Sequence, residues 1–465
     1  MKSCNLRCLL IPAGLGFIYL QIRLFSTQSA FADRLTTAVE AEKSCTIQTR
    51  ALIDRLSKQR GQILALEEQR RQLDDECKQG ILPFSQNFLV EGKQVKNLIS
   101  TEQSHVAAVV VMACNRADYL ERTMNSILKF HGSVASKYPL FISQDGSDYS
   151  VRAKAMSYNQ VTYMQHLDSK PIETEHPGEI IAYYKIARTL DFFFYFECWR
   201  FERLFSGHYK WALDRLFDLH NFGKVIILED DMEIAPDFFD YFEAAAALLD
   251  NDKSIMAVSS WNDNGQKQFV HDPLALYRSD FFPGLGWMLT KQIWNELSPK
   301  WPKAYWDDWL RLKENHRGRQ FVRPEICRTY NFGEHGSSMG QFFKRYLEPI
   351  KLNDVTVDWK SMNLSYLTED KFMNHFGSIL KNAKPVRTIR NAGVEASNVM
   401  GDVRIQYNDI HDFEVIAQQF GVFEEWKDGI PRTSYKGVVV FRFTGSKRIF
   451  LVGPSSLSEL GIPDY

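Results

Sequence analysis

Four short apolar runs, each followed at once by polar residues, constrain the fold of this chain more than any other feature. They are Val106 to Ala113, Leu140 to Ile142, Val225 to Leu228 and Ile255 to Val258. A strand that is apolar at every position is usually buried on both faces, as in a parallel sheet. Residues 119–130 have helical spacing between the first two runs, and the order strand, helix, strand predicts a parallel pair with a crossover. We therefore expect an α/β domain whose mostly parallel sheet is flanked by helices.

The polar residues after these runs should gather at one edge of the sheet, because open α/β sheets bind ligands at the carboxyl ends of their strands. Arg116 follows the first run, Asp145 the second, and Glu229, Asp230 and Asp231 the third. Adjacent carboxylates repel one another, so they stay ionised only beside a metal cation, a cationic side chain or solvent. The sequence has no Walker or G-x-G-x-x-G loop to hold phosphate. A divalent cation such as Mg²⁺ or Mn²⁺ at these acids would serve instead, and a solvated loop is the alternative.

The side chains in this acidic segment should differ in direction. In an extended segment, Glu229 and Asp231 share one face and Asp230 points away. Glu233 and Asp237 precede a helical pattern, so we interpret them as charges at the start of a helix.

A second dense cluster runs from Phe281 to Trp287. Gly284 and Gly286 allow a tight loop, and the aromatic residues offer a flat apolar surface on which a sugar ring could lie. A turn that belongs to the hydrophobic core is the alternative.

Two adjacent acids, Asp307 and Asp308, lie among aromatic residues in the segment Trp301 to Trp309. Such neighbours exclude water from a carboxylate and strengthen it as a general base. On a helix the two acids diverge by about 100°, so only one faces a given cleft. We expect the other to cap the helix or to pair with Arg311.

The chain is long enough for more than one structural unit, with 465 residues of which 45% are hydrophobic. Its 56 Lys and Arg nearly balance 57 Asp and Glu, which gives no reason to expect nucleic acid as a partner. Residues 1–30 are a basic tail and an apolar run, predicted to be a signal anchor with a cytoplasmic N-terminus. A cleaved signal peptide is the alternative.

The rest of the chain divides into three predicted parts. Residues 31–104 read as a helical stem that either self-associates as a coiled coil or stays a single helix. Residues 105–381 form the α/β domain. Residues 382–465 form a smaller α+β subdomain with a strand at 403–405, a helix near 413–420 and a final hairpin. Seven cysteines without a C-x-x-C pair indicate neither a zinc site nor a disulfide framework.

Several ordered blocks closely resemble the N-acetylglucosaminyltransferase I family of the Golgi. They include E-D-D-M-E-I-A-P-D-F-F, S-S-W-N-D-N-G, Y-R-S-D-F-F-P-G-L-G-W and K-W-P-K-A-Y-W-D-D-W, and the likeness extends from about Val106 to Pro454. The resemblance implies a GT-A nucleotide-sugar-binding fold and an inverting, Mn²⁺-dependent transfer from UDP-N-acetylglucosamine (UDP-GlcNAc). The product implied is a β1,2 linkage to the α1,3-arm mannose of a high-mannose N-glycan. It also implies a single-pass type II protein of the Golgi membrane with a lumenal catalytic domain.

The resemblance also implies roles for individual residues. Asp307 matches the base that deprotonates the mannose 2-hydroxyl, and Asp231 matches the ligand of Mn²⁺. Glu229 and Asp230 match contacts to the donor sugar and ribose. The remaining matches hold the nucleotide (Arg116, Asp145 and His208) or line the donor or acceptor site (Leu285, Trp306 and Ser338).

The chain departs from this family in two ways. Members with disulfides have cysteines where this chain has Gly146, Ala257 and Phe321, so Cys114 should be free. Thr189 to Gly207 looks like an insertion, with eight aromatic residues among nineteen, directly before His208. It could be a helical extension, a membrane-binding segment or a retained intron. If it displaces His208, the chain would be an impaired isoform or a sugar-binding homologue.

Overall fold

The computed structural model describes residues 105–167, 206–334, 343–387, 389 and 391–462. The predicted anchor and stem, Ser338 and residues 189–205 of the predicted insertion lie outside these ranges. None of the described helices combines the length and the apolar character needed to cross a bilayer. The chain separates into two units, Met1–Glu102 and Gln103–Tyr465, and the described residues all belong to the second.

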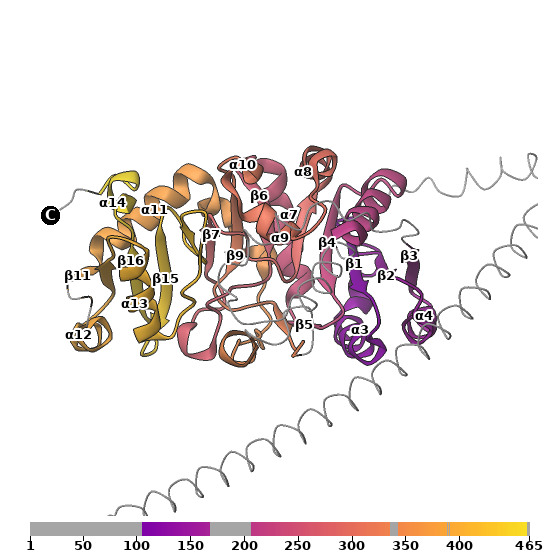
Figure 1. Cartoon of the computed structure of the whole chain (residues 1–465), viewed down its shortest axis with the longest axis horizontal. Helices are drawn as coiled ribbons and strands as arrows, with labels where there is room; N and C mark the ends of the chain where they lie inside the picture. The colour runs from indigo at the N-terminus through magenta and orange to yellow at the C-terminus, as the bar shows by residue number, and fades with distance from the viewer. Residues whose placement is uncertain (1–104, 168–205, 335–342, 388, 390, 463–465) are drawn as a thin grey trace, which may run out of the picture. The chain divides into compact units, whose positions relative to one another are not determined.

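A mixed eight-stranded sheet forms the centre of this unit, with the order β3-β2-β1-β4-β8-β6-β9-β7 (Figure 1). Its strands are β1 (Ala108–Ala113), β2 (Leu140–Asp145), β3 (Val161–His166), β4 (Lys224–Glu229), β6 (Ile255–Ser259), β7 (Leu276–Ser279), β8 (Trp287–Thr290) and β9 (Gln320–Pro324). The first four are mutually parallel, and so are β6 and β9. Because β8 is antiparallel to both β4 and β6, the strands β1 to β4, β6 and β9 all end at one edge. The predicted parallel-rich α/β sheet is confirmed.

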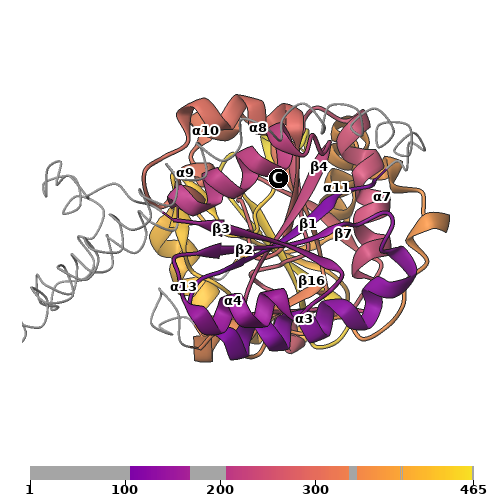
Figure 2. The ribbon, with the colours of Figure 1, turned by 90° about the vertical axis from the view of Figure 1, so that its right-hand side faces the viewer.

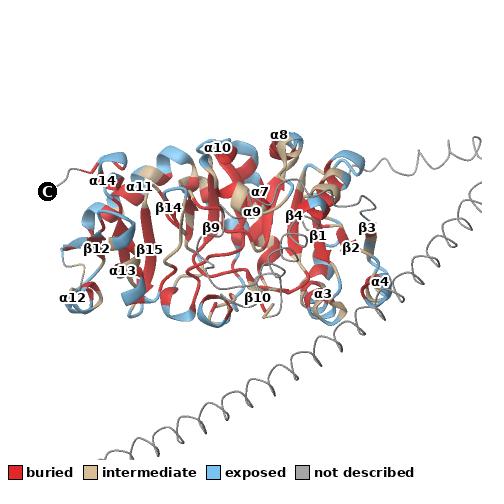
Figure 3. Ribbon diagram, in the orientation of Figure 1, coloured by how far each residue is buried: buried red, intermediate tan, exposed pale blue. Residues whose placement is uncertain are grey.

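The alternation of side chains along β1 explains why this strand is central. Val109 and Val111 face a core that includes Leu120 and Met124 of α3 (Ala117–His131). The intervening residue Val110 faces a second core, formed with residues 206–217, α8 (Lys291–Leu297) and α9 (Trp306–Arg311). Figure 2 shows α3 and α4 (Tyr149–Met156) on one side of the strands and α8 and α9 on the other. An all-apolar strand therefore has helices on both faces, and Figure 3 shows the strands as the buried layer.

A second sheet follows, with the order β11-β12-β16-β15. Its strands are β11 (Lys384–Val386), β12 (Val403–Gln406), β15 (Val438–Phe443) and β16 (Lys447–Val452). One face packs on α12 (Ala392–Asn398) and α13 (Ile410–Phe420), and the other on α11 (Glu369–Asn382). The predicted strand, helix and hairpin of this region are confirmed, and the boundary at residue 382 stays a prediction.

Smaller elements complete the unit. Two-stranded ribbons form between β5 (Met232–Ile234) and β10 (Thr329–Asn331) and between β13 (Trp426–Lys427) and β14 (Ile430–Pro431). The other helices are α7 (Phe238–Asn251), α10 (Lys313–His316) and α14 (Ser456–Glu459), with 3₁₀ turns at Gly132–Val134, Lys267–Phe269, Ser298–Lys300, Trp359–Ser361 and Leu364–Leu367 and π turns at Arg215–Leu219 and Phe343–Leu347.

Of the two residues interpreted as charges at the start of a helix, Glu233 is not one, whereas Asp237 does occupy the N-cap position of α7. Glu233 lies in strand β5 and pairs with Arg122 rather than starting a helix. Asp237 does precede α7, but its side chain makes no cap hydrogen bond. The carboxylate is fully buried and accepts from Arg328, Asn353 and Trp359. Asp237 therefore acts as a structural centre that joins distant segments, because a buried carboxylate must be paired.

Candidate active site

The acidic turn at the end of β4 is the centre of the candidate site. The strand stops at Glu229, and Asp230 and Asp231 form a turn that leads into β5. Arg116, just after β1, forms ion pairs with Asp230 and, at 3.0 Å, with Asp231. The predicted alternation is therefore wrong for these residues, because the turn directs both aspartates to one cation. Thr123 holds the turn by donating to the carbonyl of Asp230 at 2.7 Å.

Burial governs the electrostatics of this turn. It raises the pKa of Asp230 to about 6, although Arg116 acts in the opposite direction. Burial also raises the pKa of Asp231, and burial together with the charge of Asp231 raises the pKa of Glu229. Such carboxylates are costly in their ionised form, so a further cation beside them would be bound favourably.

The end of β10 also fixes Asp231. Asn331 donates to its Oδ1 at 2.9 Å, and the backbone amide of Phe332 donates to its carbonyl at 2.9 Å. Gly333 follows, and a Cβ atom at this position would lie 2.2 Å from Oδ2 of Asp231. The chain can approach the carboxylate this closely only without a side chain.

Gly333→Ala should therefore displace Asp231. We expect transfer activity to fall by about 100-fold, since displacing a reacting group by about 1 Å has an effect of that size. The measurement is kcat at saturating donor together with the melting temperature. Gly223→Ala is the matched control, because it lies before the other end of β4 and a Cβ there meets nothing within 4 Å. Equal activity of the two variants would contradict the role assigned to Gly333.

Asp145 and His208 lie near each other, and His166 contacts both of them. His166, at the end of β3, pairs with Asp145 at 2.8 Å and stacks on His208 with ring centroids 5.6 Å apart. His208 lies in the helix 206–214, and its Nε2 is 2.8 Å from Oγ of Ser143. Two of the residues predicted to hold a nucleotide therefore meet at the carboxyl ends of β2 and β3.

Burial lowers the pKa of His208 to about 4. The unfolded chain binds a proton there near pH 6.5, so the folded chain binds fewer protons between these values and is destabilised as the pH falls through them. We expect His208 to remove about 2 kcal/mol from the free energy of unfolding between pH 7.5 and pH 5. Denaturant unfolding at both pH values should show a smaller change for His208→Gln. His411→Gln is the control, because His411 is exposed. If the free energy of unfolding changes equally between the two pH values in His208→Gln and in wild type, the prediction is contradicted.

The loop before β8 enters the same edge in a strained conformation. Gly284, Leu285 and Gly286 all have positive φ, at 69°, 45° and 93°. A leucine in this region is unfavourable and is retained mainly where the surrounding structure or function requires it. Leu285 is half-buried, whereas Phe281 and Phe282 are buried in the core. The tight loop is confirmed, but these aromatic rings do not form the exposed surface that we expected for a sugar.

The segment with the two adjacent acids forms the start of α9. Tyr305, just before it, has φ of 52°. Asp307 and Asp308 each lie 2.8 Å from Nη1 of Arg311. The expected pairing of one acid with Arg311 is therefore found for both. The side chain of Asp307 is 42% exposed, so it lacks the desolvation that we predicted and is open to a substrate.

Trp306 lies at the centre of an aromatic stack rather than at an open surface. Its ring centroid is 4.4 Å from that of Tyr209, 5.7 Å from Trp287 and 5.8 Å from Trp301. This stack fixes the start of α9, and therefore the backbone that carries Asp307, against the central sheet.

Tyr209 connects the two acidic segments, and sequence reasoning missed it. Its hydroxyl donates to Glu229 at 2.8 Å while its ring stacks on Trp306. Burial raises the pKa of Tyr209, and the charges of Glu229, Asp231 and Asp307 add to this effect. All three acids are therefore close enough to act on one hydroxyl. The available signal in the sequence was its position directly after His208, in the segment H-Y-K-W-A-L, which marks Tyr209 as a residue near the site.

Comparison with known proteins identifies the family. The GNT-I family profile matches residues 11–464. The chain is 62% identical over 460 residues to the alpha-1,3-mannosyl-glycoprotein 2-beta-N-acetylglucosaminyltransferase of Arabidopsis thaliana, which covers 99% of this chain and 98% of the relative. The chain belongs to the GNT-I family. Identity at this level across nearly the whole length confirms the resemblance of the sequence blocks.

Two solved structures show a weaker likeness. A mannosyltransferase from Pyrobaculum calidifontis in complex with GDP-Man and Mn²⁺ has a TM-score of 0.30 and 14% identity, and covers 53% of this chain and 65% of its own. TarS of S. aureus in complex with UDP-GlcNAc has a TM-score of 0.30 and 11% identity, covering 68% of this chain and 71% of its own. Likenesses of this size establish no ligand for this GNT-I member.

Packing rather than a disulfide holds strands β6 and β9 together in this GNT-I member. Ala257 and Phe321 lie opposite each other in β6 and β9, and both are buried. Within the described ranges Cys114 and Cys327 are free. Burial raises the pKa of Cys114 to about 11, so its thiol is unreactive at neutral pH.

The acidic side chains of the site fit a single hard cation that is held mainly by the phosphates of a bound nucleotide and by water. In the described part of the chain, no group of three or more His, Cys, Asp and Glu could hold a metal by itself. Mg²⁺ and Mn²⁺ commonly take only one or two protein carboxylates and complete their shell with phosphate and water. Asp231, buried and beside the side-chain-free Gly333, fits this requirement.

The predicted insertion reaches the described residues only at its end. Ser206 donates to the carbonyl of Pro302 at 2.7 Å, and its own carbonyl accepts from Trp301 at 3.1 Å. The helix that is described from Ser206 onward places His208 beside His166. Within the described residues, His208 therefore stays at the carboxyl ends of β2 and β3 and is not displaced from the site.

Proposed function

We propose that this chain transfers N-acetylglucosamine from UDP-GlcNAc, with inversion, to the 2-hydroxyl of the α1,3-arm mannose of a high-mannose N-glycan such as Man5GlcNAc2. The observation that carries the proposal is the position of Tyr209, which joins the acidic turn after β4 to the acid-bearing helix α9. Two acidic groups with separate surroundings suit a reaction that needs a leaving-group site and a base. The printed name of the Arabidopsis relative supports transfer rather than sugar binding alone.

The residues at the carboxyl edge would hold the donor. Asp231 would ligate Mn²⁺, which when bound stabilises the negative charge on the departing diphosphate. Glu229 and Asp230 would contact the donor sugar and ribose, and Arg116 is placed to neutralise the same turn. Asp145 and His208, together with Leu285 and Ser338, would complete the donor and acceptor surfaces, and Trp306 would support them from within its aromatic stack. A GT-A fold is the architecture that this assignment implies.

Asp307 would act as the general base. The mannose 2-hydroxyl oxygen attacks the anomeric carbon of N-acetylglucosamine and forms the new glycosidic bond, while the bond from that carbon to the UDP oxygen breaks. The hydroxyl proton passes to the carboxylate of Asp307, and UDP leaves with the electron pair. One displacement inverts the anomeric centre, so no covalent enzyme intermediate is required.

We further propose that residues 1–30 anchor the protein in the Golgi membrane as a single-pass type II protein. Residues 31–104 would then be a stem, either coiled-coil or single-helical, that carries the catalytic domain into the lumen. The basic tail before the apolar run supports this orientation.

The test uses the full chain in detergent with UDP-GlcNAc and a Man5 N-glycan, in the presence of Mn²⁺ or EDTA. We expect a product one N-acetylhexosamine heavier, with β1,2 linkage by NMR, that forms only with metal. A glycan without the α1,3-arm mannose is the matched control. A second protein lacking residues 189–207 measures the effect of the predicted insertion. Absence of product from both proteins would refute the proposed function, and product only after the deletion would identify the full chain as an impaired isoform.

A further inference from the structure

The β13–β14 ribbon is a tight hairpin in the C-terminal part of the chain. Trp426 pairs with Pro431 and Lys427 with Ile430. The two turn residues, Asp428 and Gly429, have φ of 49° and 77°. Two positive φ values in an Asp-Gly loop are typical of a type I′ turn, which matches the twist of the strands it joins. The hairpin therefore presents its tip in a defined direction.

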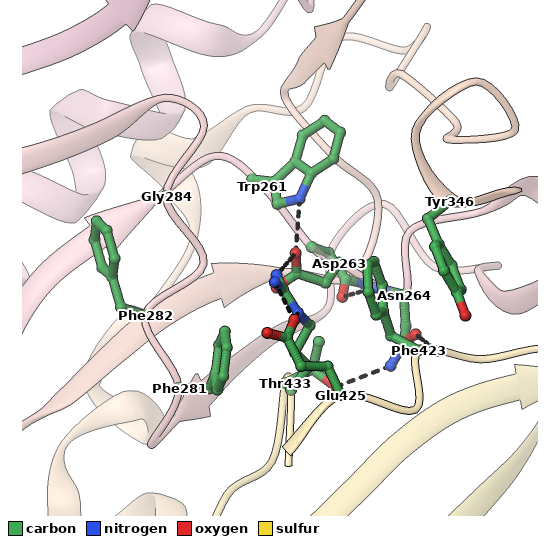
Figure 4. Close-up of polar contacts among 12 residues, drawn as sticks. Trp261, Asp263, Asn264, Phe281, Phe282, Gly284, Tyr346, Phe423, Glu425 and Thr433 are labelled. Atoms are coloured by element: carbon green, nitrogen blue, oxygen red, sulfur yellow. Dashed lines mark hydrogen bonds and ion pairs between the residues drawn. The ribbon is translucent and has the colours of Figure 1, made fainter. Parts of the chain in front are cut away.

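The open end of this hairpin is fixed to the loop that follows β6. Arg432 pairs with Glu425 and, at 2.8 Å, with the buried Asp263 of that loop. Asn264, the next residue of the loop, accepts from the amide of Phe423 at 2.9 Å and donates to Thr433 at 3.1 Å. Figure 4 shows these contacts gathered between Asp263, Asn264, Phe423, Glu425 and Thr433. Both strands of the hairpin are thus attached to the catalytic sheet.

The tip of the hairpin reaches the helix that carries the predicted base. Lys427 pairs with Oδ2 of Asp308 at 2.9 Å, and Asp428 accepts from the amide of Lys313 at 3.3 Å. The other oxygen of Asp308 binds Arg311, whose Nη1 also binds Asp307. An unbroken series of ion pairs therefore runs from Lys427 through Asp308 and Arg311 to Asp307.

The charges explain what Lys427 contributes. Asp307 and Asp308 share Nη1 of Arg311, so without Lys427 these two carboxylates would share a single cation among the residues that the structure describes. Burial would raise the pKa of Asp308, but Arg311 and Lys427 outweigh it and hold that pKa below its usual value. The further charged groups that act on Arg311 are Asp263 and Glu425, and both are paired with Arg432. Lys427 is therefore the cation that leaves Arg311 available to Asp307.

We propose that Lys427 is a positioning residue for the base, through which the C-terminal hairpin sets the orientation and the electrostatic surroundings of Asp307. The proposal rests on the proposed function, in which Asp307 accepts the acceptor proton. It gives the C-terminal part of the chain a role in transfer without requiring contact with either substrate.

The test compares Lys427→Met and Lys427→Arg with wild type in the full chain. For Lys427→Met we expect kcat to fall by about tenfold, since a small displacement of a reacting group can cost up to 10²-fold. The donor KM should change less than about twofold. Loss of a positive charge favours protonation of the nearby carboxylates, so the acid limb of the kcat profile should move to higher pH. Lys427→Arg should restore both properties.

Arg448→Met is the matched control, because Arg448 pairs with Asp402 at 2.6 Å with side-chain exposures of 26% and 24%, close to the 21% and 25% of Lys427 and Asp308. An Lys427→Met enzyme that matches this control in kcat and pH profile would overturn the proposal. The proposal would also be overturned if kcat fell together with the melting temperature while the acid limb of the kcat pH profile stayed where it is in wild type. If neither wild type nor the protein with the insertion deleted shows transfer, the proposed function fails separately. Hydrogen exchange then decides the positioning: the amides of residues 306–311 should exchange faster in Lys427→Met than in Arg448→Met, and equal rates would refute it.

Discussion

Asp307→Asn should reduce transfer by about 10² to 10⁴-fold in kcat, the range that a positioned general base contributes. Asparagine keeps the shape of the side chain and still accepts from Arg311, but it cannot take the proton of the acceptor hydroxyl. Because Asp307 is 42% exposed and lies outside the aromatic stack of Trp306, we expect the fold to be unaffected. The measurement is kcat with Man5 N-glycan, with UDP binding by calorimetry as the test of an intact donor site.

Asp308→Asn is the matched control for this substitution. The two acids are adjacent and lie at the same distance from Arg311, yet Asp308 also binds Lys427. We expect a loss of about tenfold for Asp308→Asn, because it acts only through Asp307. Equal losses for the two variants would show that neither residue is the base, and full activity of Asp307→Asn would refute its role directly.

Asp231→Asn should remove the metal-dependent binding of UDP and lower transfer by about 10³-fold. A carboxylate contributes several kcal/mol when a cation stabilises the developing charge of the leaving group, and an amide oxygen is a much weaker ligand. Asn331 can still contact the substituted side chain at its Oδ1 position, so the turn after β4 should keep its shape. Calorimetry of UDP with Mn²⁺ and with EDTA measures the effect apart from catalysis.

Glu233→Gln provides the control in the same segment. Glu233 is two residues further along and pairs with the exposed Arg122, a contact worth at most about 1 kcal/mol. Binding of UDP should keep its dependence on Mn²⁺ in this variant. If Asp231→Asn binds UDP equally well with metal and with EDTA at the wild-type affinity, then Asp231 is not the ligand.

The fold was largely predictable because its central strands carry an unambiguous pattern. Val225 to Leu228 are apolar at every position, and the structure buries all four between helices on both faces. The C-terminal hairpin was equally clear from two apolar runs on either side of T-G-S-K. In both cases local sequence and long-range packing favour the same structure, which makes a prediction reliable.

The details of the site depended on contacts that a linear pattern does not contain. Asp230 and Asp231 face the same way because Arg116, more than a hundred residues earlier, pairs with both. Asp237 is buried because three distant donors surround it. The hairpin that carries Lys427 had a local signal in W-K-D-G-I-P, but its partner Asp308 lies 119 residues earlier in the sequence. Motifs thus identified the acids, and only tertiary structure gives their partners.

The position of β8 next to β4 affects how the protein folds during synthesis. Strand β4 lies between β1, which precedes it by more than a hundred residues, and β8, which follows some sixty residues later. During synthesis the nascent chain therefore carries β4 without one of its two neighbours until residue 290 has emerged. Contacts this distant in sequence form slowly, and domains assemble as units once their parts are complete. We therefore expect the carboxylates after β4 to stay hydrated until β8 has joined the sheet.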